Sequence, residues 1–565
     1  MLKKKGKAFA VIALLLVGAI YYYLTIPAIN IHAAGFWTFV FVCLVVITAV
    51  HWVRCFGKRE TFRDIANMSS LKELRTLGGD NVTRILVLVI LLLAAVYVIG
   101  SVLSSPIVNA KRYTQLLEPE NSSFTEDIQQ ISYNMIPILD KDSATLLGNR
   151  KMGSMVDLVS QFEVSDIYSQ INYNDRPVRV TPLVYASAIK WITNMSNGIP
   201  AYIRIDMATQ NTELVKLEEG IRYSEAEYFN RNIYRHLRFH YPTYIFDQIS
   251  FEIDEEGIPY WICPVKKYEI GLFGGQTIGR VVLCNAITGE CQSFKIEDCP
   301  TWVDRVFPAD LLIKLYDYHG TLKNGYFNSI LGQKGCLRTT DGYNYLAIDD
   351  DVWVYTGVTS VSGDQSNVGF VLMNQRTKQT KYYEIPGAEE YSAMSSAEGQ
   401  VQNLGYRATF PLLLNVSNEP TYFIALKDNA GLVKKYAMVN IQKYQNVAIG
   451  DTVSECERTY IKMLKGSGVA VANENTKKIT GIIHRMVQAV VDGSTHFYIV
   501  LDQDKEVIYD VPIADFLGIV KYDVGDRITI AYNEEKPANT VISVEGDAGS
   551  AEGILGLETV EETGS

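Results

Sequence analysis

Three long apolar runs near the start of the chain constrain its fold more than any other feature of the sequence. They cover residues 8–29, 33–53 and 85–105, and none contains Lys, Arg, Asp or Glu. Each run holds about 20 residues, the length a helix needs to cross roughly 30 Å of hydrocarbon with its backbone groups bonded internally. We therefore expect three transmembrane helices and assign residues 1–106 to a membrane anchor.

The distribution of Lys and Arg around these runs predicts the orientation of the anchor. Four lysines precede the first run and seven basic residues lie in 54–84, whereas residues 30–32 carry none. Because cytoplasmic segments are enriched in Lys and Arg, the N-terminus and the loop 54–84 are expected in the cytoplasm, and everything after residue 106 outside. A cleaved signal peptide is the alternative for the first run, given its lysine-rich start and the small residues Ala33 and Ala34. Cleavage would leave the later topology unchanged.

Charge divides the chain at the same place. Residues 1–106 contain 11 basic and 4 acidic side chains, and the rest of the chain contains 41 basic and 59 acidic ones. An acidic surface repels phosphate backbones, which argues against a nucleic-acid partner. With 565 residues, 48% of them hydrophobic, the chain is too long for a single core, and we expect several domains.

An internal repeat dominates the expected outer region. Residues 201–217, 279–296, 368–385 and 421–439 each contain an apolar strand, a polar turn and a second strand. Partial alternation, as in Ile203 and Ile205 around Arg204, predicts one buried and one exposed face. A lone hairpin is not stable in water, so these units must pack on further elements.

Helical segments follow three of these hairpins. They are expected at 223–237, 301–319 and 451–464, and the unit is therefore a hairpin with a helix covering its apolar face. The fold class expected is α+β. Residues 107–180 are assigned to a membrane-proximal linker with the first helices, and 181–470 to tandem α+β repeats.

Residues 223–296 resemble the PepSY domain, and the other repeats resemble it more loosely. The resemblance rests on five residues in their turn and strand contexts, Asp254, Gly257, Tyr260, Thr288 and Gly289. The chain departs from the family plan by the insertion "KKYEIGLFGGQ" at 266–276 and by its cysteines. PepSY domains occur in propeptides of secreted peptidases and beside cortex-lytic enzymes, so the resemblance implies a partner that is a peptidase or a cell-wall hydrolase.

The C-terminal part of the chain reads as a separate module. Residues 476–546 contain about five short strands separated by turns, which suggests a small SH3-like or OB-like β-barrel. Residues 547–565 are acidic and rich in small residues, and we expect a flexible tail there.

The cysteines suggest one covalent link. If the turn of "VVLCNAITGECQSF" is centred on residues 286–289, Cys284 and Cys291 stand opposite each other on neighbouring strands. A disulfide between them is expected, with buried free thiols as the alternative. A metal site is disfavoured, because CxxC-like spacing and nearby histidines are both missing from the local sequence.

Other motifs are better explained by ordinary structure than by chemistry. His236 and His240 have metal-ligand spacing but flank two arginines, so helix-surface histidines are expected. The glycine-rich stretch 271–279 lacks the Lys-Ser/Thr of a phosphate loop and is expected to be a mobile hairpin loop. The carboxylates at 140–143 and 348–353 lack the ligand ladder of a calcium loop and are expected in turns. We expect no cofactor and no catalytic residues.

These observations lead to a non-enzymatic, membrane-anchored binding protein of the bacterial envelope. A Gram-positive source is expected because no outer-membrane feature is found. Its partners would be the lipid bilayer and an extracytoplasmic protein, with the chain tethering or regulating a secreted peptidase or cell-wall hydrolase. The alternative is a scaffold subunit of a membrane-associated complex.

Overall fold

The computed structural model describes residues 2–56, 81–128, 136–360, 366–466, 477–491, 494–513, 516–533 and 538–545. Side chains 2–11, 55 and 56 are among those not described. The chain divides into two compact units, residues 1–460 and 461–565, and each is considered by itself. Most of the expected cytoplasmic loop, residues 57–80, and the expected acidic tail, residues 547–565, lie outside the described residues.

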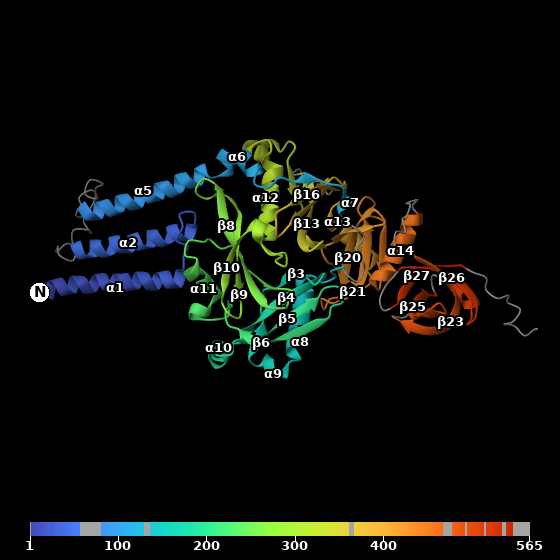
Figure 1. Cartoon of the computed structure of the whole chain (residues 1–565). Helices are drawn as coiled ribbons and strands as arrows, with labels where there is room; N and C mark the ends of the chain where they lie inside the picture. Colours follow the sequence, from blue (N-terminus) through green and yellow to red (C-terminus); the bar gives the residue numbers. More distant parts are fainter. Residues whose placement is uncertain are drawn as a thin grey trace, which may run out of the picture. The chain divides into compact units, whose positions relative to one another are not determined.

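Three helices form the N-terminal part of the first unit (Figure 1): α1 (Leu2–Thr25), α2 (Ala34–Phe56) and α5 (Asn81–Leu103). Within the described residues, two of them, not three, are long and apolar enough to cross a membrane, over Ala34–Arg54 and Asn81–Leu103. The described apolar part of α1 is shorter, Ile12–Thr25, and the predicted run 8–29 extends past the end of this helix. The prediction of three spans is therefore corrected to two candidates.

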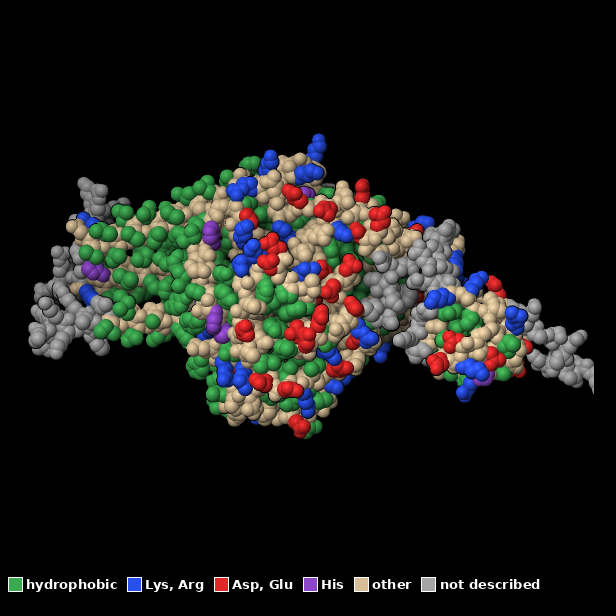
Figure 2. Space-filling model, viewed as in Figure 1, with side chains coloured by type: hydrophobic (Ala, Val, Ile, Leu, Met, Phe, Trp, Pro, Cys, Tyr) green, Lys and Arg blue, Asp and Glu red, His purple; other side chains and the backbone are tan. Residues whose placement is uncertain are grey.

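The exposed surfaces of these helices are apolar. Hydrophobic side chains cover the visible faces of all three helices in Figure 2, while charged side chains gather on the body of the unit. On α5, Leu88 is 65% exposed and Leu92 59% exposed. Apolar surface on this scale is costly in water and is accommodated by lipid, so the surface agrees with membrane insertion.

Four antiparallel meanders of four strands each make up the body of the first unit. In chain order they are β3–β4–β5–β6, β7–β8–β9–β10, β12–β13–β15–β16 and β19–β20–β21–β22. The strands are β3 (Ser169–Tyr173), β4 (Arg176–Tyr185), β5 (Ile199–Asp206), β6 (Thr212–Ile221), β7 (Ser250–Ile253), β8 (Pro259–Ile270), β9 (Gly274–Asn285), β10 (Cys291–Lys295), β12 (Asn344–Ile348), β13 (Asp351–Ser360), β15 (Gly369–Asn374), β16 (Thr380–Tyr383), β19 (Leu412–Val416), β20 (Glu419–Lys427), β21 (Val433–Asn440) and β22 (Val447–Gly450).

Short strands extend the edges of these sheets. The strand β2 (Phe162–Val164) pairs with β4, β11 (Leu337–Thr339) with β13, β18 (Arg407–Ala408) with β20, and β1 (Glu120–Asn121) runs parallel to β16. The strands β14 (Ser366–Asn367) and β17 (Gly387–Ala388) form a separate pair.

The predicted hairpins are all present, but within larger sheets. Three of them are the last two strands of a meander, β5–β6, β9–β10 and β15–β16, whereas residues 421–439 form the middle pair β20–β21. The first meander begins with β3 and β4, inside the segment assigned to a linker, so the boundary at residue 180 is wrong. The segment was misassigned because β4 is buried on both faces and lacks alternation.

A helix lies after each meander. They are α11 (Ile233–His240), α12 (Ala309–Leu322), α13 (Glu390–Gln400) and α14 (Val453–Gly466), of which α13 was not expected. Burial explains α12 best, because its buried face, including Leu312 and Leu315, belongs to one core with Val281 of β9 and Val371 of β15. The helix α6 (Pro106–Thr114), which follows α5, packs on α12. The remaining α-helices of the described chain are α7 (Phe124–Asp127), α8 (Lys141–Gly153), α9 (Val156–Val159) and α10 (Ala188–Asn194).

The second unit contains a closed barrel, as expected for residues 476–546. Its order is β23–β24–β25–β27–β26, formed by β23 (Lys477–Val491), β24 (Ser494–Leu501), β25 (Asp504–Pro512), β26 (Arg527–Asn533) and β27 (Asn539–Glu545). The long strand β23 pairs with both β24 and β26, and β25 runs parallel to β27. This strand order favours the OB-like alternative over the SH3-like one. Its core includes Ile483, Ile499, Val511 and Ile530.

Candidate functional site

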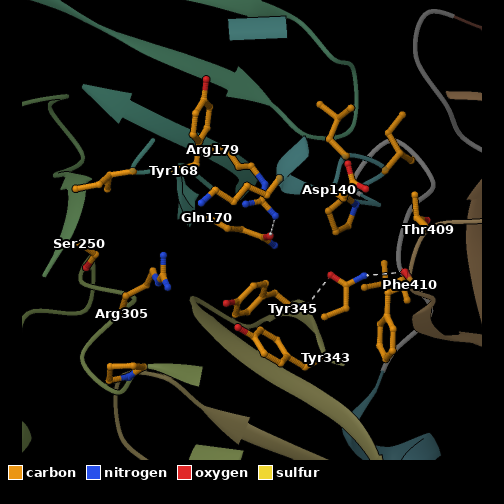
Figure 3. Close-up of a pocket in the computed structure, with 18 of the residues that line it drawn as sticks. Asp140, Tyr168, Gln170, Arg179, Ser250, Arg305, Tyr343, Tyr345, Thr409 and Phe410 are labelled. Carbon is orange, nitrogen blue, oxygen red and sulfur yellow. Dashed lines mark hydrogen bonds between the residues drawn. The ribbon is translucent and has the colours of Figure 1, made fainter. Parts of the chain in front are cut away.

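A cavity of about 450 Å³ lies where the four meanders meet in the first unit (Figure 3). The first strand of each meander contributes to its wall: Gln170 from β3, Ser250 from β7, Tyr345 from β12 and Leu412 from β19. Residues from four sheets far apart in the sequence thus converge on one space. The volume is in the range of small-molecule sites.

Arg179 is the most unusual side chain of this cavity. It lies on β4, opposite Gln170 in the register of β3, and is only 6% exposed. One guanidinium nitrogen donates to the Gln170 amide oxygen at 3.1 Å, and the buried Nε has no hydrogen-bond partner in the described part of the chain. Burial lowers the pKa of Arg179 to about 10. The group remains a cation at neutral pH, held by a neutral amide.

Arg305 supplies a second guanidinium to the cavity, and a buried acid positions its backbone. Glu252 on β7 accepts hydrogen bonds from the backbone N–H groups of Asp304, at 2.9 Å, and Arg305, at 3.1 Å. Burial raises the pKa of Glu252 to about 7, and burial together with Glu252 raises the pKa of Asp304. In the described part of the chain, no carboxylate forms an ion pair with the Arg305 side chain.

The half-buried acid of the cavity is already neutralised. Asp140 accepts hydrogen bonds from the Lys427 ammonium and from the Ser143 N–H, which it caps at the start of α8. Burial acts to raise the pKa of Asp140, but these two partners outweigh it and hold the pKa below its usual value. The other charged lining residues, Lys141, Asp166 and Asp310, are exposed.

Aromatic and aliphatic side chains complete the wall. Tyr343 and Tyr345 lie edge to face with ring centroids 5.6 Å apart, and Phe410 and Leu412 close another side. Burial, with Tyr345 alongside, raises the pKa of Tyr343, so its hydroxyl keeps its proton and can donate a hydrogen bond. Two guanidiniums and two phenols beside an apolar wall can hold a small anion that has an apolar body.

The glycine-rich stretch forms the tip of the β8–β9 hairpin, and this tip contacts the membrane helices. The backbone N–H groups of Leu272 and Phe273 donate to Ser104 Oγ just after α5, at 2.7 and 3.1 Å. His32 Nδ1 lies 2.6 Å from the Leu272 carbonyl, and Trp37 at the start of α2 packs on Phe273. The predicted hairpin loop is confirmed, but it is held by these contacts. The insertion 266–276 therefore reaches the N-terminal helices.

The connection between α1 and α2 is also fixed to the body of the unit. Arg238 on α11 donates from Nε to the Ile26 carbonyl at 3.0 Å, and Asn30 donates to the Thr243 carbonyl at 2.9 Å. Residues 26–33 and the region after residue 106 therefore lie on the same side of the helices.

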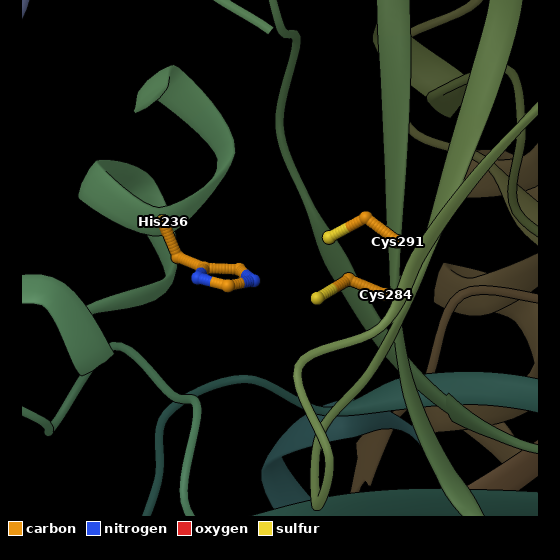
Figure 4. A group of neighbouring side chains, drawn as sticks. All are labelled: His236, Cys284 and Cys291. Atoms are coloured by element: carbon orange, nitrogen blue, oxygen red, sulfur yellow. The ribbon is translucent and has the colours of Figure 1, made fainter. Parts of the chain in front are cut away.

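Cys284 and Cys291 stand directly opposite each other in the β9–β10 register, as predicted, and both are free thiols in this structure. The expectation that no histidine lies near them is wrong. A ring nitrogen of His236 and the two sulfurs all lie within 4.8 Å of one another, because α11 packs over the β9–β10 turn (Figure 4). The ring of His240 lies beside that of His236, with centroids 4.3 Å apart and the planes tilted by 47°.

The remaining sequence predictions concern turns. Asp140 caps α8, and residues 349–350 form the tight turn between β12 and β13. Three residues of the PepSY-like pattern, Asp254, Gly257 and Gly289, lie in tight turns, with Gly257 and Gly289 at φ +84° and +78°. Of these residues, Asp140 lines the cavity, and the others lie outside its wall.

Sequence reasoning missed Arg179, Arg305, Gln170 and Glu252. One signal was available for two of them: Arg179 interrupts the apolar stretch "PVRVTPLVY" and Glu252 interrupts "ISFEI". A charged residue inside a strand buried on both faces is rare unless a partner or a ligand compensates it. Nothing in the sequence indicated that these strands would meet.

Comparisons with known proteins provide no family for this chain. No family model matches it, and no curated protein matches it. Among solved structures, the crystal structure of an ACO/RPE65 chimera aligns with 66% of this chain and 59% of its own, at 7% identity and a TM-score of 0.14. This similarity is too low to support a statement about fold or function, so the cavity is interpreted from its own geometry.

Proposed function

We propose that this chain is a membrane-anchored binding protein that captures a small anion with an apolar body in the cavity of its first unit. The observation that carries the proposal is Arg179, a buried cation with a neutral partner and an unpaired Nε. An uncompensated buried charge costs several kcal/mol. A bound carboxylate or phosphate would compensate it and would be held by bidentate hydrogen bonds.

The contacts at the membrane junction support an outward-facing body. The tip 271–273 contacts His32, just before α2, and Ser104, just after α5. The start of α2 and the end of α5 therefore lie on the same side, and the two helices run from there to the basic loop 54–84 and back. By the positive-inside rule, that loop is cytoplasmic and the body extracytoplasmic.

The envelope of a Gram-positive bacterium remains our proposal for the location, and binding rather than catalysis remains our proposal for the activity. The peptidase or cell-wall hydrolase partner implied by the PepSY resemblance stays a prediction, with a membrane-complex scaffold as the alternative. Crosslinking in intact membranes followed by affinity purification distinguishes these two: a hydrolase favours the first and a membrane assembly the second.

Ligand capture is tested by thermal melting and calorimetry of the full chain in detergent. The probes are N-acetylleucine, its amide and inorganic phosphate. We expect the acid to raise the melting temperature and the amide to leave it unchanged, because only the acid offers a charge to Arg179. At a hundred times its Kd, a ligand adds about 2.7 kcal/mol to the free energy of unfolding. Stabilisation by phosphate alone would point to a phosphorylated ligand.

Arg179→Met is the informative variant, and Arg204→Met is its matched control. Arg204 lies on the next strand, β5, where it pairs with Glu213 away from the cavity. Arg179→Met should weaken the binding of the acid at least tenfold, and Arg204→Met should leave it unchanged. Equal binding by both variants would end the proposal, as would failure of every probe to bind the wild-type chain.

Sidedness is tested with an impermeant thiol reagent on intact cells. A cysteine introduced by Glu218→Cys on the exposed strand β6 should be labelled, and one introduced by Lys72→Cys should be protected. The reverse pattern would place the cavity in the cytoplasm.

A further inference from the structure

The turn between β9 and β10 carries a second group of reactive side chains, separate from the cavity and independent of its proposed function. Cys284 lies near the end of β9 and is fully buried, and Cys291 begins β10 and is partly exposed. Figure 4 shows both sulfurs directed toward the ring of His236 from α11. A buried thiol, an accessible thiol and an imidazole therefore share one site.

The strand register places the two thiols within reach of a disulfide bond. The Asn285 N–H donates to the Glu290 carbonyl at 2.9 Å, so Asn285 and Glu290 form a hydrogen-bonded pair. Such pairs alternate along an antiparallel ladder, which makes Cys284 and Cys291 a non-hydrogen-bonded pair with Cα atoms about 4.5 Å apart. This separation is at the short end of the range that disulfides span. Oxidation and reduction thus need little backbone movement.

The hydrogen bonding of His236 argues against a metal ion as the resident of this site. Its Nε2 lies 2.7 Å from the Gly289 carbonyl oxygen. A carbonyl can only accept, so Nε2 carries the proton and does not offer a lone pair to a metal. The same N–H faces the Cys291 sulfur. His236 is therefore arranged as a donor to a thiolate.

Electrostatics agrees with this geometry. Hydrogen bonds from Cys284 and then from His236 lower the pKa of the Cys291 thiol, with His240 contributing through its charge. The hydrogen bond to Cys291 and burial raise the pKa of the Cys284 thiol. Burial acts to lower the pKa of His236, but its bonds to Cys291 and Gly289 outweigh this effect and raise it. The accessible sulfur is the one that carries charge.

We propose that Cys284 and Cys291 form a redox-active dithiol that exchanges with disulfides, with Cys291 as the attacking thiol, Cys284 as the resolving thiol and His236 as the positioning residue. The oxidant is a disulfide, RS–SR, either of low molecular weight or in a partner polypeptide.

The Cys291 thiolate attacks one sulfur of RS–SR, which forms a mixed disulfide and releases RS⁻, and the His236 imidazolium protonates this leaving group. Cys284 then loses its proton to solvent and attacks the Cys291 sulfur. The bond between Cys284 and Cys291 forms, and the second RS⁻ leaves and takes up a proton from solvent. Two thiols are oxidised by two electrons and RS–SR is reduced to two RSH.

The test uses the reduced full chain in detergent with bis(2-hydroxyethyl) disulfide as the probe, acid quenching and peptide mass mapping. The wild-type chain should end with a Cys284–Cys291 disulfide. Cys284→Ser should stop at a mixed disulfide on Cys291, and Cys291→Ser should form adducts at least tenfold more slowly. Accumulation of the mixed disulfide on Cys284, or retention of one Zn²⁺ per chain with both thiols blocked by it, would overturn the proposal.

The pH dependence separates a positioning role of His236 from a purely structural one. The titratable groups around Cys291 are Cys284, His236, His240, Tyr241 and Cys263. In the Cys284→Ser background, adduct formation on Cys291 should change less than about threefold between pH 6 and 8, because the thiolate is already present. Adding His236→Gln should restore the pH dependence of an ordinary thiol, for which the rate of adduct formation rises about tenfold per pH unit. Adding His240→Gln should leave the shallow dependence unchanged. A steep rise with His236 intact would contradict the assignment.

Discussion

Two arginines of the first unit, Arg376 and Arg179, are both largely buried but have different partners. Arg376 donates from Nε and from a terminal nitrogen to the two carboxylate oxygens of Asp351, at 2.6 and 2.9 Å, and this carboxylate also accepts from Asn374. Arg179 has the amide of Gln170 at 3.1 Å and an unpaired Nε. Arg376 lies in the turn between β15 and β16, beside a smaller pocket, and Arg179 lies within β4 beside the cavity.

The difference shows how to separate a structural charge from a functional one. A buried ion pair with all its hydrogen bonds is complete, and removing one member leaves the other uncompensated. A buried cation beside a cavity is incomplete without a ligand, so its removal relieves a cost. The two arginines should therefore respond in opposite ways to the same substitution.

The largest effect is expected for Arg376→Met. The variant leaves Asp351 mostly buried beside Asn374 and without its cation, so the free energy of unfolding should fall by about 3 kcal/mol. Urea titration followed by tryptophan fluorescence measures the loss. A loss below about 1 kcal/mol would show that Arg376 contributes little to stability, and it could then no longer serve as the structural arginine in the comparison.

Glu252→Gln extends the comparison to an acid without a cation at hydrogen-bond distance. Burial raises the pKa of Glu252 from 4.5 to about 7, so the folded chain binds this proton more tightly than the unfolded chain. Its contribution to stability is complete below pH 4.5 and is lost as the pH rises to about 7, by about 3 kcal/mol. The variant should flatten this decline in melts recorded across that interval. An unchanged slope would show that Glu252 is ionised throughout.

Arg179→Met should have a smaller effect of the opposite sign. Without ligand, replacing an uncompensated buried cation by an apolar side chain should raise the free energy of unfolding by about 1 kcal/mol. The same urea titration measures it. A loss comparable to that of Arg376→Met would break the comparison, because it would make Arg179 a structural residue.

Arg204→Met should have the smallest effect. Arg204 pairs with Glu213 at 2.7 Å, but the two side chains are 27% and 47% exposed. Exposed ion pairs contribute little, so the change in unfolding free energy should stay below about 0.5 kcal/mol. A larger change would show that burial is a poor guide to these charges and would weaken the contrast between Arg376 and Arg179.

Local features of the fold were predictable from the sequence, and long-range ones were not. The apolar runs, the hairpins and the pairing of Cys284 with Cys291 depend on neighbours in the chain, and the structure contains them. The first run was drawn too long, because it was extended to residue 29 whereas α1 ends at Thr25, and the described apolar part of this helix, Ile12–Thr25, is shorter than a span. The first meander was cut at residue 180 because a strand buried on both faces shows no alternation.

The candidate site was out of reach of sequence reasoning for a physical reason. Its arginines, tyrosines and amides come from strands and loops spread from residue 170 to residue 345, and only the packing of four sheets brings them together. The histidine beside the thiols was missed in the same way, since α11 lies far from the β9–β10 turn in sequence. Isolated charges inside apolar strands were the one local sign of such sites.

The strand β9 connects the tip of the β8–β9 hairpin with the dithiol. It begins at Gly274, against the membrane helices, and reaches Cys284 ten residues later. At about 3.3 Å per residue, the dithiol lies about 33 Å along the strand from the contact with Ser104. The dithiol also lies near the end of α1, because His236 beside the two sulfurs and Arg238, which donates to the Ile26 carbonyl, belong to the same helix, α11. On the proposals above, a protein that exchanges disulfides with this chain must therefore present its reactive sulfur beside the end of α1.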